Sequence, residues 1–386
     1  MYSSSRLLNV IITLLSCVAH VISEFQCQGT CYSGSFPKNN QVIKGKHLRG
    51  YSNKNITTDV SRTCFSSCVN DCRCKAFQMK DVRCELLDED KTSKAADFVN
   101  ETGYVYYDLQ QTFYKGKSHM VHPAGVCYNG CCRSQPCMNG GTCVEHCETP
   151  KVKFSCKCPN TIGGKTCEMK IKSCIDVLKG TAPGTMPANG TYIITRSDNK
   201  TTVPVYCAFE SPNQTWTLIE SFSLQNNYVF NNKAFHQNHP RNQESHNWND
   251  YRLSLSSMKY IQTKATMFRA TCEYQNRDSL TPGFVLGYKK DFDIINSGNQ
   301  RGYCVNFSYA NFKGYEFQRQ RVPIWHAKDQ WHLHLDISLG LCGFTPPAAT
   351  YIHNEDNFGH YNAINQAFKC TATNQSTIQW WLGEQQ

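Results

Sequence analysis

The spacing of six cysteines between Cys132 and Cys167 constrains the fold of this chain more than any other sequence feature. They follow the order C-x4-C-x5-C-x12-C-x-C-x8-C, with glycine pairs before the third and the last cysteine. A segment this short buries too little apolar surface to fold unaided, so covalent cross-links must stabilise it. The glycines suit a cross-linked hairpin because they accept the positive φ of tight turns.

This segment, residues 132–168, resembles an EGF-like domain. The resemblance implies pairing of the first cysteine with the third, the second with the fourth and the fifth with the sixth, as Cys132–Cys143, Cys137–Cys156 and Cys158–Cys167. Cys147 is a seventh cysteine and departs from that pattern. It needs a partner outside the module, and Cys131 and Cys127 lie nearest in sequence.

Residues 1–23 predict a cleaved secretory signal, in which Arg6 precedes an apolar run that ends at Ile22. A retained membrane anchor is disfavoured because polar residues interrupt the run. Cleavage removes Cys17 and leaves 22 of the 23 cysteines. An even, dense set indicates a disulfide framework in an oxidising compartment rather than metal ligands or redox catalysts. We therefore expect a secreted, extracellular protein with every cysteine paired.

Seven N-x-[ST] sequons agree with secretion and are candidate glycosylation sites. They are Asn55, Asn100, Asn189, Asn199, Asn213, Asn306 and Asn374. The chain carries 40 basic and 30 acidic residues, scattered without a long run of one sign. This distribution does not indicate nucleic-acid binding. We interpret the excess of positive charge as simple solubility, and attraction to acidic glycans or anionic surfaces is the alternative.

Residues 25–114 predict a compact α+β unit. A helix over residues 60–72, capped by Asp59 or Ser61, places Cys64 and Cys68 on one face. Extended segments are expected at residues 74–79, 83–87 and 103–109. The segments CFSSC, CRCKAF and RCELL resemble the PAN, or apple, family, whose members bind proteins or carbohydrates. The resemblance implies Cys64–Cys84, and Cys68 with Cys74 or Cys72, of which we favour Cys68–Cys74. The partners of Cys27, Cys31 and Cys72 stay open.

Residues 115–131 read as a linker. His119 and His122 have a metal-like spacing there, but a lone pair on a linker is interpreted as exposed and unused. The third unit, residues 170–386, begins with four runs interpreted as strands: SCIDVLKG, then residues 189–194, 203–210 and 215–223. Their order resembles the start of a fibrinogen-like domain and implies a disulfide between Cys174 and Cys207.

The fibrinogen-like resemblance weakens after about residue 223. Only the acidic cluster at residues 354–357 lies near the place of that family's calcium ligands, so we expect binding that does not depend on calcium. The later cysteines allow three pairings among Cys272, Cys304, Cys342 and Cys370. The tandem tryptophans Trp380 and Trp381 predict a final strand that is buried on at least one face.

The strongest candidate for an active site is a run in which strand alternation places His332, His334 and Asp336 on one face. A metal-dependent hydrolase could use such a set. We favour instead a half-exposed strand whose apolar face is Trp331, Leu333, Leu335 and Ile337, because no other zinc motif accompanies it. His236, His239 and His246 form a loose group in an Asn-rich loop. No catalytic residue, metal ligand or cofactor is predicted.

We therefore expect a multidomain, disulfide-rich chain with an α+β PAN/apple domain, a small β EGF-like module and a mostly β, α+β fibrinogen-like domain. The expected function is non-enzymatic recognition or adhesion through binding to extracellular glycans or glycoproteins, with neither nucleic acid nor a transmembrane anchor involved. A structural component of the extracellular matrix, without a soluble ligand, is the alternative. The sequence leaves the oligomeric state open.

Overall fold

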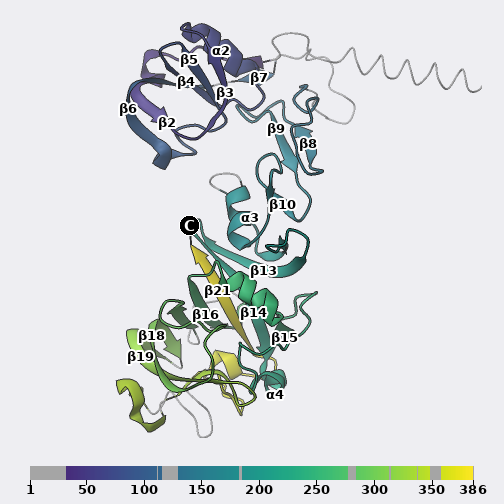
Figure 1. Ribbon diagram of the computed structural model, residues 1–386, viewed down its shortest axis with the longest axis vertical. Coiled ribbons are helices and arrows are strands. Elements are labelled where there is room, and N and C mark those ends of the chain that lie inside the picture. Colours follow the sequence, from purple (N-terminus) through teal and green to yellow (C-terminus); the bar gives the residue numbers. More distant parts are fainter. Residues whose placement is uncertain are drawn as a thin grey trace, which may run out of the picture. The chain divides into compact units, whose positions relative to one another are not determined.

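The computed structural model describes residues 32–110, 112–114, 129–181, 185–276, 284–312, 314–336, 338–347 and 358–385. It divides into two compact units, coloured along the chain in Figure 1. The first unit takes the described residues up to 159 together with 165–168, and the second takes 160–164 and those from 169 onward. The predicted signal, His119, His122 and the acidic cluster at 354–357 lie outside the described residues.

A five-stranded antiparallel sheet forms the body of the first unit. Its strands, in spatial order, are β2 (Val42–Leu48), β6 (Phe98–Asp108), β4 (Ala76–Lys80), β5 (Arg83–Leu87) and β3 (Ser52–Thr57). A separate pair joins β1 (Tyr32–Ser33) to β7 (Phe113–Tyr114). Short 3-10 turns occupy η1 (Asn39–Gln41) and η2 (Ala95–Asp97). The α+β expectation for this region is confirmed, and strand β5 has the predicted bounds.

Helix α2 (Ser61–Asn70) packs on this sheet and buries Cys64, Cys68 and Val69. The predicted caps are wrong, because Val60 is the N-cap residue and caps through no side chain. The helix ends where the Asp71 carboxylate accepts hydrogen bonds from the backbone N–H groups of the residues two and three positions later, at 2.8 and 3.1 Å. This local turn diverts the backbone out of the helix.

The cysteine-rich segment that follows contains the hairpin of β8 (Thr142–Glu145) and β9 (Phe154–Lys157). A further short hairpin, β10 (Ile162–Gly163) with β11 (Met169–Lys170), belongs to the second unit. Positive φ at Gly140, 79°, and at Gly164, 93°, fits the predicted need for glycine in these turns.

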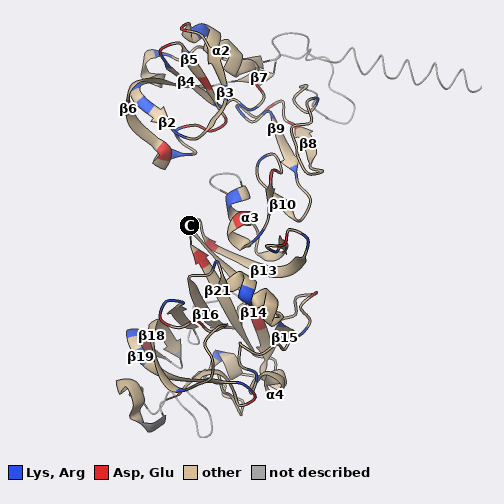
Figure 2. Cartoon of the chain, viewed as in Figure 1, with Lys and Arg blue, Asp and Glu red and all other residues tan. Residues whose placement is uncertain are grey.

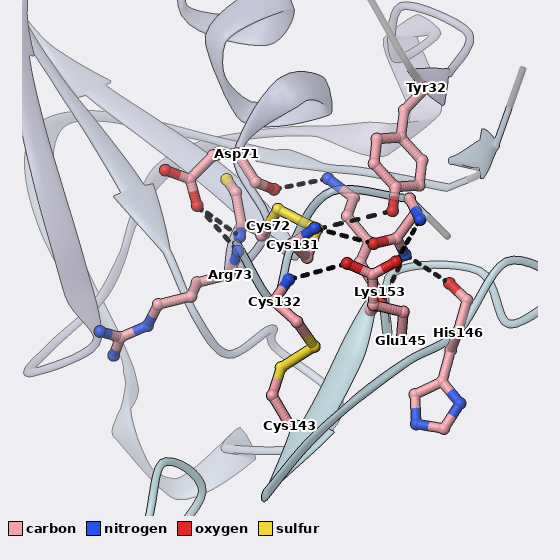
Figure 3. Close-up of a disulfide and its surroundings, with 12 residues drawn as sticks. Tyr32, Asp71, Cys72, Arg73, Cys131, Cys132, Cys143, Glu145, His146 and Lys153 are labelled. Carbon is pink, nitrogen blue, oxygen red and sulfur yellow. Dashed lines mark hydrogen bonds between the residues drawn. A yellow bond between two sulfur atoms is a disulfide. The ribbon is translucent and has the colours of Figure 1, made fainter. Parts of the chain in front are cut away.

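A disulfide between Cys72 and Cys131 ties this segment to the sheet domain within the first unit (Figure 3). Beside the disulfide, the ammonium group of Lys153 is buried and donates to the backbone carbonyls of Val69 and Asp71, at 2.6 and 2.5 Å. The last carbonyls of a helix have no partner within the helix, so a lysine from β8–β9 satisfies those of α2. Burial lowers the pKa of Lys153 to about 8.

A ten-stranded sheet organises the second unit. Its main path is β12 (Gly190–Thr195), β13 (Thr202–Ser211), β14 (Gln214–Ser223), β21 (Thr377–Gln385), β16 (Met267–Cys272), β17 (Phe284–Tyr288), β18 (Gln300–Phe312), β19 (Tyr315–Ala327) and β20 (Trp331–Leu335), with β15 (Asp250–Arg252) beside β14. Its described helices are α3 (Cys174–Gly180), α4 (Asn227–Phe230), α5 (Leu255–Gln262), η3 (Leu224–Asn226), η4 (Ser338–Gly343) and η6 (Lys369–Thr371). None of the described helices is long and apolar enough to cross a membrane.

The final strand β21 lies between β14 and β16 in the middle of this sheet. All of its residues except the last are buried, so it is buried on both faces. Trp380 packs against Phe235 and Phe358, with ring centroids 5.5 and 6.1 Å apart. The predicted burial of this strand is confirmed, and it places the last residues of the described chain at the centre of the core.

The interpretation of SCIDVLKG as a strand is wrong, because Cys174–Gly180 forms helix α3. Its buried residues are Cys174, Ile175, Val177 and Leu178. They recur at intervals of one, three and four positions, which is the period of a helix and not the alternation of a strand.

Candidate recognition site

The first unit carries a charged cluster, which we define as His47, Arg49, Lys80, Arg83, Glu85, Glu101 and Tyr104. These residues come from β2, β4, β5 and β6 and from the turn after β2. In Figure 2, basic and acidic residues are interspersed over this unit rather than segregated. The cluster therefore combines both signs of charge in one place.

Glu85 is the buried centre of the cluster, only 2% exposed. Its carboxylate accepts hydrogen bonds from Gln78 Nε2 at 2.7 Å and from Tyr104 Oη at 3.2 Å. Arg83 Nε lies 2.8 Å from the same carboxylate. A buried carboxylate is stable only with such partners, so this network fixes the side chains that surround it.

Gln78 also holds the neighbouring backbone in position. Its side-chain oxygen accepts from Leu48 N–H at 2.9 Å, and its amide nitrogen donates to Leu48 C=O at 3.3 Å. Leu48 pairs with Phe98 of β6 but not with β4. The glutamine side chain thus supplies the hydrogen bonds that a neighbouring strand would otherwise make, and it fixes the end of β2 that carries His47 and leads to Arg49.

Glu101 is the second carboxylate of the cluster and sits in a bulge of β6. His47 Nδ1 lies 2.8 Å, Arg49 Nη2 3.1 Å and Lys80 Nζ 3.8 Å from it. Hydrogen bonds from His47 and Arg49 lower the pKa of Glu101. It is therefore ionised at neutral pH and holds three basic side chains around itself.

Gly103 shapes this bulge, because its φ of 88° is disfavoured for other residues. The Lys80 stem passes 3.4 Å from where a Cβ on Gly103 would lie. Lys80 Nζ then reaches a position 5.1 Å from the centre of the Tyr104 ring. The His47 ring stacks on the same tyrosine with centroids 4.1 Å apart. The glycine thereby allows two basic side chains to pack around one aromatic ring.

The outer part of the cluster is accessible. The side chains of Arg49, Arg83 and Lys80 are 63%, 58% and 41% exposed. Guanidinium groups bind carboxylate, sulfate or phosphate oxygens in pairs, and an ammonium group adds a point charge. A rigid base with three exposed cationic side chains can therefore bind an anionic, oxygen-rich ligand.

The structure brings together the six cysteine pairs implied by the three resemblances. They are Cys64–Cys84, Cys68–Cys74, Cys132–Cys143, Cys137–Cys156, Cys158–Cys167 and Cys174–Cys207. The open group of four later cysteines forms two disulfides, Cys272–Cys370 and Cys304–Cys342.

Cys131 bonds to Cys72, so it is not the partner of Cys147. Cys147 is itself disulfide-bonded. The other suggested partner, Cys127, lies outside the described residues, as do Cys27 and Cys31. Every cysteine within the described ranges is in a disulfide.

The histidine strand of the second unit is not half-exposed as expected. His332 and His334 are 1% and 5% exposed, and Leu333 and Leu335 are fully buried. Alternation along a strand separates its two faces, but it does not show whether the second face is also covered. Asp336 follows β20 and is partly exposed, and Ile337 lies outside the described residues.

Glu220, and not Asp336, is the carboxylate beside His332. His332 Nε2 lies 2.6 Å from Glu220 Oε1, and the other oxygen of Glu220 accepts from Arg252 at 2.7 Å. Arg252 also donates to the carbonyls of Lys233 and Ala234. This buried network therefore anchors the loop after α4. In the described part of the chain, no group of three or more His, Cys, Asp or Glu side chains is arranged to hold a metal ion.

The loop histidines lie in different surroundings. His236 Nε2 is 3.2 Å from Asn299 Oδ1, whereas His246 packs against Trp248 with ring centroids 4.2 Å apart. Burial lowers the pKa of His246 to about 4, and it also lowers the pKa of His239. These side chains are therefore neutral at pH 7.

The predicted glycosylation sites differ in accessibility. Asn55, Asn100, Asn199, Asn213, Asn306 and Asn374 are exposed. Asn189 is instead engaged on both sides of its amide. Its nitrogen donates to Tyr274 Oη at 3.1 Å and its oxygen accepts from Phe209 N–H at 2.8 Å. This asparagine has a structural role in the second unit.

Residues 38–111 match the PAN domain family. This range contains the whole charged cluster. The first unit contains a PAN domain. PAN domains bind proteins or carbohydrates, which is consistent with a role of this region in recognition.

A further comparison finds two relatives over about a third of the chain. A stretch of 143 residues is 29% identical to von Willebrand factor A domain-containing protein 2 of Homo sapiens and covers 36% of this chain and 18% of that protein. The Mus musculus protein of the same name is 31% identical over 159 residues, which cover 37% and 19%. The chain thus spans about a fifth of the length of the curated relatives it matches.

Proposed function

We propose that this protein is a secreted, non-enzymatic adhesion protein that binds acidic glycans of extracellular glycoproteins through the charged cluster of its PAN domain. The observation that carries the proposal is the exposure of Arg49, Arg83 and Lys80 around a carboxylate network that is itself fixed by hydrogen bonds. Sulfate and carboxylate groups of glycans match these cations in charge and geometry.

Preorganisation favours binding at this cluster. Glu85 and Glu101 already hold the charged groups of Arg83, Arg49 and Lys80, so less conformational entropy is lost when a ligand binds. The three permanent cations outnumber the two carboxylates, which leaves the cluster with a net positive charge at neutral pH. Such binding is expected to weaken as salt screens the charges.

The same proposal extends to the neighbouring segments. We infer that residues 132–168 are an EGF-like module, supported by the order in which its six cysteines pair. We infer that residues 170–386 are a fibrinogen-like domain, supported by the Cys174–Cys207 disulfide. Several weak binding modules on one chain raise apparent affinity when their ligands are close together. Secretion is supported by the apolar segment at residues 1–23 and by the density of disulfides.

A charge-matched pair of variants tests the proposal. Arg49→Ala with Arg83→Ala removes two exposed cations from the cluster. Arg133→Ala with Lys54→Ala removes two exposed cations elsewhere in the first unit. Lys54 is a suitable control because it faces away from the cluster. It pairs with Leu86 of the apolar core, whereas its neighbour Asn55 pairs with Glu85 of the cluster, and successive residues of a strand point to opposite faces.

Binding to immobilised heparin is measured by surface plasmon resonance at several salt concentrations. We expect the cluster variant to bind roughly tenfold more weakly or worse, because charge-assisted hydrogen bonds contribute about 1.5–3 kcal/mol each. The affinity of the control variant for heparin should stay within about twofold of the unmodified protein, because isolated surface charges contribute little. Equal losses in the two variants, or binding that is insensitive to salt, would contradict the proposal.

A further inference from the structure

Two glycosylation sequons border the charged cluster. Asn55, of the sequon Asn55-Ile56-Thr57, lies on the edge strand β3 directly opposite Glu85 of β5. Residues opposite each other in an antiparallel pair point to the same face, with Cβ atoms close together. Asn55 therefore stands beside the buried centre of the cluster.

Asn100, of the sequon Asn100-Glu101-Thr102, borders the cluster at Glu101. It immediately precedes Glu101, the carboxylate that His47, Arg49 and Lys80 surround. It also pairs with Lys46 of β2, one residue before His47. Asn55 thus lies opposite a cluster residue across the β3–β5 pair, whereas Asn100 adjoins the cluster in sequence, beside the bulge of β6.

The accessibility of both asparagines allows modification. Asn55, Asn100 and the threonines of both sequons, Thr57 and Thr102, are all exposed. The other sequons, at Asn189, Asn199, Asn213, Asn306 and Asn374, belong to the second unit. Both sequons of the first unit therefore fall at its proposed binding site.

We propose that N-linked glycans on Asn55 and Asn100 stand over the charged cluster and restrict its access to large acidic glycans. In the modification, the asparagine Nδ2 forms a bond to C1 of an oligosaccharide carried on a lipid diphosphate. The bond from C1 to the diphosphate breaks, the amide nitrogen loses a proton and the lipid diphosphate leaves. This inference rests on the proposed function, because it concerns regulation of that same site.

Restriction follows from where the glycans are attached. An N-linked glycan is bulky and hydrophilic, and it moves about its attachment point. Asn55 lies opposite Glu85, the partner of Arg83, so a glycan on Asn55 covers Arg83. Asn100 precedes Glu101, the partner of Arg49, so a glycan on Asn100 covers Arg49. A polymeric ligand must displace it to contact these side chains, so occupancy of the two sequons sets the affinity.

The test uses the full chain secreted from a eukaryotic cell line, with heparin as the probe. One variant carries Asn55→Gln and Asn100→Gln, and a second carries Thr57→Val and Thr102→Val. Both remove the sequons by different side-chain changes, so agreement between them assigns the effect to the glycans. Asn213→Gln, at an exposed sequon of the second unit, is the matched control. Peptide mass mapping measures occupancy, and unglycosylated protein made with tunicamycin shows whether the substitutions alter binding by themselves.

We expect both asparagines to be occupied and both variants to bind heparin roughly threefold more tightly or better, with the control unchanged. Unmodified Asn55 and Asn100 would overturn the inference. Occupied sites with unchanged affinity would also overturn it, while the loss of binding in the Arg49→Ala, Arg83→Ala variant would leave the proposed function standing. Failure of every form to bind heparin, including the unglycosylated one, would overturn both.

Discussion

The two compact units are stabilised in different ways. The described part of the first unit has two small apolar clusters and six disulfides whose partners are both described. The second unit has one continuous core and three such disulfides. Small bodies bury a smaller fraction of their surface than large ones, so the first unit depends more on covalent links.

The two units also differ in the surroundings of their buried charged side chains. In the first unit, Lys153 is buried against the carbonyl groups of α2 and has Cys72–Cys131 beside it (Figure 3). In the second unit, Glu220 and Arg252 pair deep inside an apolar core. A unit held by covalent links can expose charged side chains for recognition, whereas the second unit uses its charges to fix a loop.

Removal of a core side chain should have the largest effect, and only in the second unit. Trp380→Ala deletes a fully buried ring that contacts Phe235 and Phe358. We expect a loss of about 3–5 kcal/mol in the unfolding free energy of the second unit, from lost burial and the cavity left behind. Hydrogen exchange resolved by peptide measures each unit separately. Equal destabilisation of the first unit would show that the two do not unfold independently.

Removal of the disulfide that joins the two parts of the first unit should have the next largest effect. Cys72→Ala with Cys131→Ala opens a link across 59 residues and leaves no free thiol. We expect a loss of about 2–4 kcal/mol, confined to the first unit, because the unfolded chain gains freedom. Cys304→Ala with Cys342→Ala, which spans 38 residues of the second unit, is the matched comparison. A smaller loss in the first unit than in the second would contradict the proposed difference.

Glu384 provides a smaller, pH-dependent test of the second unit. Burial, with the nearby Asp176 charge, raises the pKa of Glu384 from 4.5 to about 7. The folded state therefore disfavours the ionised form, and its stability should fall between about pH 4.5 and 7 and then level off.

Glu384→Gln should remove that decline and stabilise the second unit by at most about 3 kcal/mol at pH 8, with little effect at pH 4. Chemical denaturation followed by tryptophan fluorescence at both pH values measures this. A benefit that is larger at pH 4 than at pH 8 would show that the carboxyl group is not held in its neutral form.

The sequence predicted local features of the fold better than long-range ones. The pairs Cys64–Cys84 and Cys132–Cys143 lie within single modules, and family resemblance implied them. Cys72–Cys131 joins two modules, so neither module's pattern contained it. Helix α3 has only seven residues, and an apolar run that short is ambiguous between helix and strand.

The candidate site was not predicted, because its residues are far apart in sequence. Glu85 contacts Gln78 nearby but also Tyr104, and Glu101 contacts His47 across 54 positions. Gly103, within an aromatic run, was the only local sign of the bulge that brings them together. The histidines of β20 were recognised, but the covering of their second face depends on Phe235 and Trp380 from distant segments.

Controlled reduction of the full chain tests most directly whether a covalently stabilised first unit carries recognition. Heparin binding and peptide-resolved hydrogen exchange are measured on the same samples as the concentration of reductant rises. Protection of β2 to β6 and heparin binding should be lost together, while β14 and β21 keep their protection. Binding that persists after the first unit has lost protection, or that disappears only when the second unit unfolds, would contradict this expectation.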